Sequence, residues 1–155
     1  KIQAPARTPR PPLPAQVEQG REIEFDLYWR AVNRVTSDYT VFVHLVGADD
    51  RPVAQADSPP AFGMLPTSAF LPGDTLRDPR RLPIPAGVPT GRYRLLVGLY
   101  DAASGARLFP SSAPTIVARL TIGLARRGIV GWPLHADSDR VVVGGIEVVP
   151  ATARR

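Results

Sequence analysis

The clearest pattern of apolar and polar positions lies at residues 91–108, GRYRLLVGLYDAASGARL. Apolar side chains recur there at every second position, namely Tyr93, Leu95, Val97 and Leu99. This is the period of a pleated β-strand and not of a helix. The segment DAASG at 101–105 has the composition of a tight turn. We therefore predict a long strand, a turn and a returning strand at the centre of the fold.

Two more strands are predicted upstream of this hairpin. In residues 21–31 every second side chain is apolar and shares one face, and the other face is mostly charged, as expected for a half-buried strand. The apolar face consists of Ile23, Phe25, Leu27, Trp29 and Ala31. Residues 39–46, YTVFVHLV, are apolar on both faces, which favours a central strand. Residues 53–57 should return beside them as a hairpin through the turn GADDR.

The second half of the chain contributes three further predicted strands. Residues 75–84 contain Pro79 and Pro83, so they are predicted to form an edge or bent strand. Residues 115–122 alternate again, and residues 141–149 are rich in valine, with Gly144 and Gly145 placed as a bulge.

The segment at 58–73, SPPAFGMLPTSAFLPG, is apolar but interrupted by proline and glycine. We predict an ordered crossing loop packed by four of its side chains, Phe62, Met64, Leu65 and Phe70. An exposed aromatic patch, if the protein has one, is expected in this loop.

Composition narrows the fold class. Eighteen prolines and 13 glycines in 155 residues make long helices improbable, and no apolar run is long enough to span a bilayer. We predict an all-β protein, an antiparallel two-sheet sandwich of about eight strands at residues 21–150. Residues 1–20 are predicted to be a proline-rich linker, and 151–155 a basic tail. The start at Lys1 suggests a segment of a larger precursor.

The net charge of +5 does not predict a nucleic-acid groove. Five basic residues near the termini account for the whole excess, namely Lys1, Arg7, Arg10, Arg154 and Arg155. The rest of the chain contains equal numbers of basic and acidic residues. We therefore expect no nucleic-acid partner. The absence of cysteine excludes disulfides and thiolate chemistry.

Candidate chemistry is sparse. The two histidines, His44 and His135, lie outside any hydrolase motif, and His44 is expected to be a packed or edge residue. The run HADSD at 135–139 has ligand-like spacing for a hard cation, but we interpret it as a solvated loop before the last strand. We therefore expect no catalytic residues, no metal and no cofactor.

Several segments, in this order along the chain, resemble an immunoglobulin-like domain: DYTVFVHLVGADDRPVAQAD (38–57), LPTS (65–68), FLPGDTLRD (70–78), LPIPAGVPTGRYRLLVGLYDAASGARL (82–108) and VVVGGIEV. That domain is the C-terminal extracytoplasmic appendage of bacterial multi-spanning membrane proteins, notably glycosyltransferases of the dolichyl-phosphate-mannose mannosyltransferase type. The resemblance implies an extracytoplasmic module, tethered to the membrane-embedded part of the same polypeptide, without catalytic residues. Residues 123–139 depart from the family pattern.

Two functions compete. The first is a non-catalytic structural or interaction module. The alternative is a carbohydrate-binding module, in which exposed aromatic rings stack on a glycan and charged side chains bind its hydroxyls. The candidate ligand residues are Trp132, Tyr100, Tyr28, Phe62, Phe70 and His135. A sugar binder should show two or three exposed aromatic faces in one groove.

Overall fold

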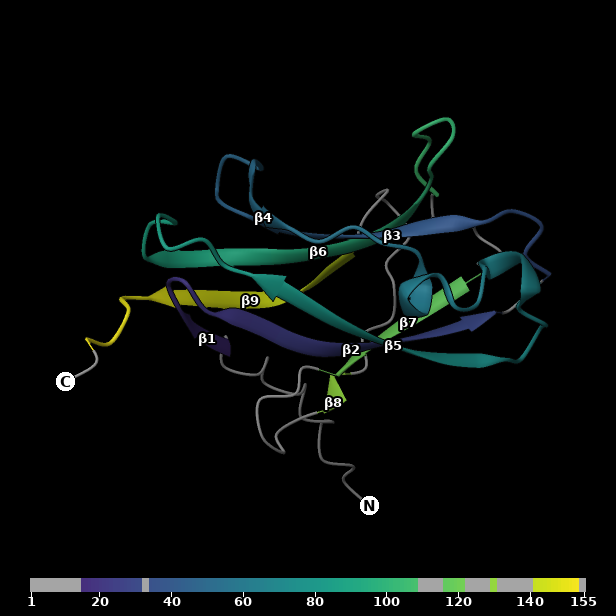
Figure 1. The fold of residues 1–155 in the computed structure, drawn as a ribbon, viewed down its shortest axis with the longest axis horizontal. Coiled ribbons are helices and arrows are strands. Elements are labelled where there is room, and N and C mark those ends of the chain that lie inside the picture. Colours follow the sequence, from purple (N-terminus) through teal and green to yellow (C-terminus); the bar gives the residue numbers. More distant parts are fainter. Residues whose placement is uncertain (1–14, 32–33, 109–115, 122–128, 131–140, 154–155) are drawn as a thin grey trace, which may run out of the picture.

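The described part of the chain is mostly β-structure with almost no helix (Figure 1). The computed structural model describes residues 15–31, 34–108, 116–121, 129–130 and 141–153. The strands in these ranges are β1 (Ala15–Glu18), β2 (Glu22–Ala31), β3 (Tyr39–Val46), β4 (Pro52–Gln55), β5 (Thr75–Pro83), β6 (Gly91–Asp101), β7 (Ile116–Thr121), β8 (Ile129–Val130) and β9 (Val141–Val149). Two short 3₁₀ turns, η1 (Pro60–Gly63) and η2 (Thr67–Ala69), lie between β4 and β5.

The strands form two sheets that Figure 1 shows as two layers. The first has the strand order β1-β9-β6-β3-β4, and the second has the order β5-β2-β7-β8. Buried apolar side chains from both sheets belong to one hydrophobic cluster, to which β2 contributes Ile23, Phe25, Leu27, Trp29 and Ala31. The alternation predicted for residues 21–31 is therefore confirmed, because every second side chain of β2 faces this core.

Strand β6 is central, as predicted. It pairs antiparallel with β3 on one side and with β9 on the other. Leu95, Val97 and Leu99 are buried in the core, and Tyr93 packs partly against it. Strand β3 lies between β6 and β4 and is buried on both faces, since Phe42 and Val46 are also nearly inaccessible. Its predicted central position is confirmed.

The edge position predicted for residues 75–84 is also confirmed. Strand β5 has β2 as its neighbour and ends the second sheet. Pro79 and Pro83 lack an N–H, so they can be tolerated there without loss of a ladder hydrogen bond. The bulge predicted in the last strand is found beside Gly144, where the register between β6 and β9 shifts by one residue.

The first strand corrects the expected boundaries and strand directions. Residues 15–18 were expected to be linker, yet they form β1, with Val17 in the core. Strand β1 pairs parallel to β9, so the first sheet is mixed and not wholly antiparallel. No tight hairpin joins these two strands, because the rest of the chain lies between them, and their relative direction is therefore unconstrained. Residues 1–14 of the expected linker lie outside the described ranges.

The chain after β9 is tied to β1. The Thr152 hydroxyl donates a hydrogen bond of 2.6 Å to the Glu18 carboxylate. Hydrogen bonds from Thr152 lower the pKa of Glu18. Within the described ranges, no helix is long and apolar enough to cross a membrane.

Replacement of Leu95 by alanine tests the assignment of the core. The side chain is fully buried on β6, so Leu95→Ala should lower the free energy of unfolding by roughly 2–5 kcal/mol in urea denaturation. The exposed Arg92 of the same strand provides the control, and Arg92→Ala should change stability little. A cost near zero for Leu95→Ala would show that the faces of β6 are assigned wrongly.

Candidate functional site

A buried ion pair lies at the edge of the second sheet. Asp78 and Arg80 of β5 are 0% and 3% exposed, and Arg80 Nη2 lies 2.7 Å from Asp78 Oδ2. Both side chains point to the inner face of the strand, because β5 alternates exposed and buried positions. Charged groups at such depth are stable only when they are paired and hydrogen-bonded.

Hydrogen bonds satisfy this ion pair from three directions. Trp29 Nε1 of β2 donates to Asp78 Oδ2 at 2.8 Å, and the backbone N–H of Ala61 donates to Asp78 Oδ1 at 2.9 Å. Arg80 donates to Ser58 Oγ at 2.6 Å and to the backbone oxygens of Ser58 and Pro59 at 3.2 and 3.4 Å. The polar network therefore joins β5, β2 and the start of the segment at 58–73.

Ser58 extends the network to the other sheet. Its N–H donates to the Val41 oxygen at 3.1 Å, and its oxygen accepts from the Val41 N–H at 3.0 Å. Val41 belongs to β3 of the five-stranded sheet. A chain of direct hydrogen bonds therefore runs from β5 through Arg80 and Ser58 to β3, and it crosses between the two sheets.

The backbone next to Ala61 is strained. Ala61 and Phe62 have φ values of 47° and 57°, and Gly63 follows with φ at 80°. Non-glycine residues in this left-handed region cost roughly 1–2 kcal/mol each. The hydrogen bond from the Ala61 N–H to Asp78 helps to hold this turn, in which the Phe62 side chain is 67% exposed.

The far end of the same segment is also anchored. The buried Thr67 hydroxyl donates to the Ser37 oxygen at 2.6 Å and accepts from the Tyr39 N–H at 2.9 Å. The Ser68 N–H donates to Asp38 at 3.0 Å, and its hydrogen bonding lowers the pKa of that carboxyl. The segment at 58–73 is thus fixed on both sides of its exposed tip.

The tip exposes large apolar side chains. Met64 is 84% and Leu65 39% exposed, in addition to Phe62, and Leu71, which follows the anchor at Thr67, is 58% exposed. The prediction that Phe62, Met64 and Leu65 pack the loop is therefore wrong, and among the four expected packing residues only Phe70 is buried. The prediction that an exposed aromatic patch would lie in this loop holds for Phe62.

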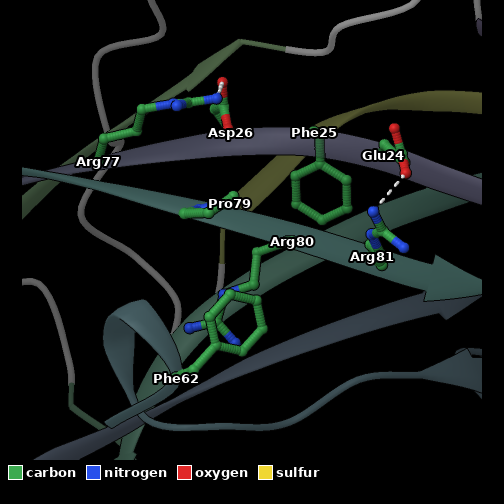
Figure 2. Close-up of a pocket in the computed structure, with 8 residues that line it drawn as sticks. All are labelled: Glu24, Phe25, Asp26, Phe62, Arg77, Pro79, Arg80 and Arg81. Carbon is green, nitrogen blue, oxygen red and sulfur yellow. Dashed lines mark ion pairs between the residues drawn. The ribbon is translucent and has the colours of Figure 1, made fainter. Parts of the chain in front are cut away.

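A hollow of about 330 Å³ lies where this tip meets β2 and β5 at the edge of the second sheet (Figure 2). Its lining residues are Glu24, Phe25, Asp26, Phe62, Arg77, Pro79, Arg80 and Arg81. Figure 2 shows Phe62 on one side of the hollow, and two arginine–carboxylate pairs on others. The volume is at the lower end of the range for ligand pockets, roughly 300–1,000 Å³.

The register of β2 and β5 explains the two exposed ion pairs. Arg81 stands directly opposite Glu24 and lies 3.2 Å from its carboxylate. Arg77 is the diagonal neighbour of Asp26, and their charged groups are 2.9 Å apart. Hydrogen bonding to Asp26 raises the pKa of Arg77. A slip of one residue would separate these partners by turning them to opposite faces.

The structure separates most of the candidate ligand residues. Phe62 lines the hollow, and Tyr28 is half-buried opposite Arg77 in the same ladder. Phe70 is buried, and Tyr100 lies in the other sheet, 6.5 Å from the Phe42 ring. Trp132 and His135, with the HADSD run, lie outside the described residues. The predicted set therefore forms no single groove in the part of the chain that the structure describes.

His44 is packed, in line with the sequence interpretation. Its Nε2 lies 3.3 Å from Asp57 Oδ1, and its ring centroid lies 5.0 Å from that of Phe42. Within the described ranges, no three His, Cys, Asp or Glu side chains gather where they could share a metal ion.

Sequence reasoning missed Asp78 and Arg80, although a signal was present. The positions that alternate along β5 on its inner face are Leu76, Asp78, Arg80 and Leu82. Two opposite charges on an otherwise apolar face indicate either a buried pair or a wrong strand assignment.

No family model, curated protein or solved structure matches the chain.

Removal of one partner of the buried pair tests the network. Arg80→Met should lower the free energy of unfolding by roughly 3–5 kcal/mol, because it leaves the Asp78 carboxylate buried without a counter-charge. The double variant Asp78→Leu/Arg80→Met should cost less than the sum of the two single variants, measured by urea unfolding. Additive costs would show that the two side chains do not act as a unit. If Arg80→Met does not fold, the same measurement is made on Arg80→Lys, which keeps the positive charge but loses the guanidinium contacts to Ser58.

Proposed function

We propose that the chain is a non-catalytic extracytoplasmic module that works by contact with the membrane-embedded part of a larger polypeptide. Its fold is then an immunoglobulin-like β-sandwich, which is supported by the two sheets and their common core. The order of the segments that resemble the appendages of bacterial membrane glycosyltransferases supports the same role.

The observation that carries the proposal is the exposed tip of the segment at 58–73. Met64 and Leu65 expose apolar surface between the anchors, Leu71 exposes more just after them, and the segment contains no charged residue. Exposed apolar groups of this kind are typical of contact sites, because their burial against a partner is favourable. The anchors at Ser58, Ala61 and Thr67 fix the tip in advance, which lowers the entropic cost of binding.

Site-specific photo-crosslinking in the full-length polypeptide tests the proposal. A photoreactive residue in place of Met64 should crosslink to the membrane-embedded part in native membranes. The control position is the exposed Ala48, in the turn between β3 and β4 at the other end of the fold (Figure 1). Position 48 should give little product. Equal yields from both positions, or none from Met64, would contradict the proposed contact.

A further inference from the structure

The hollow beside β5 lies at the edge of the second sheet, and the contact proposed above does not use it. Its lining combines one exposed aromatic ring, Phe62, with two arginine–carboxylate pairs (Figure 2). Pro79 and the buried Phe25 and Arg80 complete it. Phe62 is 67% exposed on a turn with positive φ angles. A ligand can therefore reach its ring without a change in the backbone conformation, so binding costs no such rearrangement.

The charges of the hollow indicate what kind of ligand it can take. Arg77 is balanced by Asp26, and Arg81 by Glu24, while Arg80 is engaged by Asp78. A phosphate or another anion would meet two carboxylates, and a cation would meet two guanidinium groups. The arrangement instead suits an uncharged ligand whose polar groups both donate and accept hydrogen bonds.

We propose that the hollow binds a carbohydrate, as a single pyranose ring or two. The apolar C–H face of such a ring can stack on Phe62, and its hydroxyls can donate to Asp26 and Glu24 and accept from Arg77 and Arg81. A hydroxyl does both at once, which matches paired donors and acceptors on the walls. The inference rests on the proposed function in one respect, namely that the module acts by binding.

The strand register sets the spacing of the polar groups. Glu24 and Asp26 project from alternate positions of β2, with Arg81 and Arg77 beside them on β5. Tyr28 follows on the same face of β2, opposite Arg77, and extends the row by a second, half-buried aromatic ring. The hollow has one exposed ring, fewer than the two or three exposed aromatic faces expected of a sugar binder, and a volume of about 330 Å³, so we expect weak binding. For a monosaccharide of about a dozen non-hydrogen atoms, a Kd on the order of 1 mM is expected.

Titration followed by ¹H–¹⁵N NMR tests the site with defined probes. The methyl glycosides of glucose, galactose, mannose and N-acetylglucosamine would be added to the ¹⁵N-labelled chain to about 20 mM. At least one should shift the amides of Gly63, Arg77 and Arg81 in a saturable way and leave Gly47 unmoved. Sorbitol is the control, because it has the hydroxyl groups but no pyranose ring that could stack on Phe62. Equal shifts with sorbitol, or no shift with any glycoside, would overturn the proposal.

Two matched variants assign the binding to the hollow. Phe62→Ser should raise Kd roughly tenfold, because the stacking surface is lost. Met64→Ser removes an equally exposed apolar side chain that does not line the hollow, and it should leave Kd unchanged. Binding that survives Phe62→Ser, or that Met64→Ser weakens as much, contradicts the assignment.

The photo-crosslinking from position 64 reports separately on the proposed function. Crosslinking retained without any glycoside response would reject the carbohydrate site alone. A glycoside response without crosslinking would reject the membrane contact alone.

Discussion

The buried pair of Asp78 and Arg80 is the constraint on which the described structure depends. It occupies the inner face of an edge strand, where apolar side chains would be expected, and its hydrogen bonds reach β2 through Trp29 and the other sheet through Ser58. Apolar packing between sheets is non-directional, whereas this network fixes which part of one sheet faces which part of the other. A buried pair of this kind is costly to break from one side.

The same network explains why the edge of the second sheet and the exposed tip occur together. Strand β5 is a poor template for pairing with another chain, because it contains Pro79 and Pro83 and because the charged side chains of Asp78 and Arg80 point inward. Asp78 holds the Ala61 amide, so the strained turn at 61–63 is fixed against this edge. Phe62 of this turn lines the hollow, and the exposed Met64 follows the turn directly.

Much of the fold could be predicted from the sequence because alternation is a local property. The pattern in β2, β3 and β6 identified their buried faces, and Pro79 identified the edge strand. Strand β1 was missed because AQVE holds a single large apolar residue, and its partner lies at the far end of the chain. The hollow could not be predicted, because it depends on the register of β2 with β5 and on the left-handed turn that directs Phe62 outward. Phe70 looked similar to Phe62 in the sequence, yet only its contacts in the fold show that it is buried.

Hydrogen exchange at the Ala61 amide is the most direct measurement of the central role of Asp78. This N–H lies in an irregular segment, and its partner is the buried Asp78 carboxylate. If the network joins the tip to both sheets, the amide should exchange as slowly as that of Leu27 in β2, since both open only when the whole domain unfolds. Exchange as fast as that of the exposed Ala48 would show that the tip opens on its own and would contradict the account.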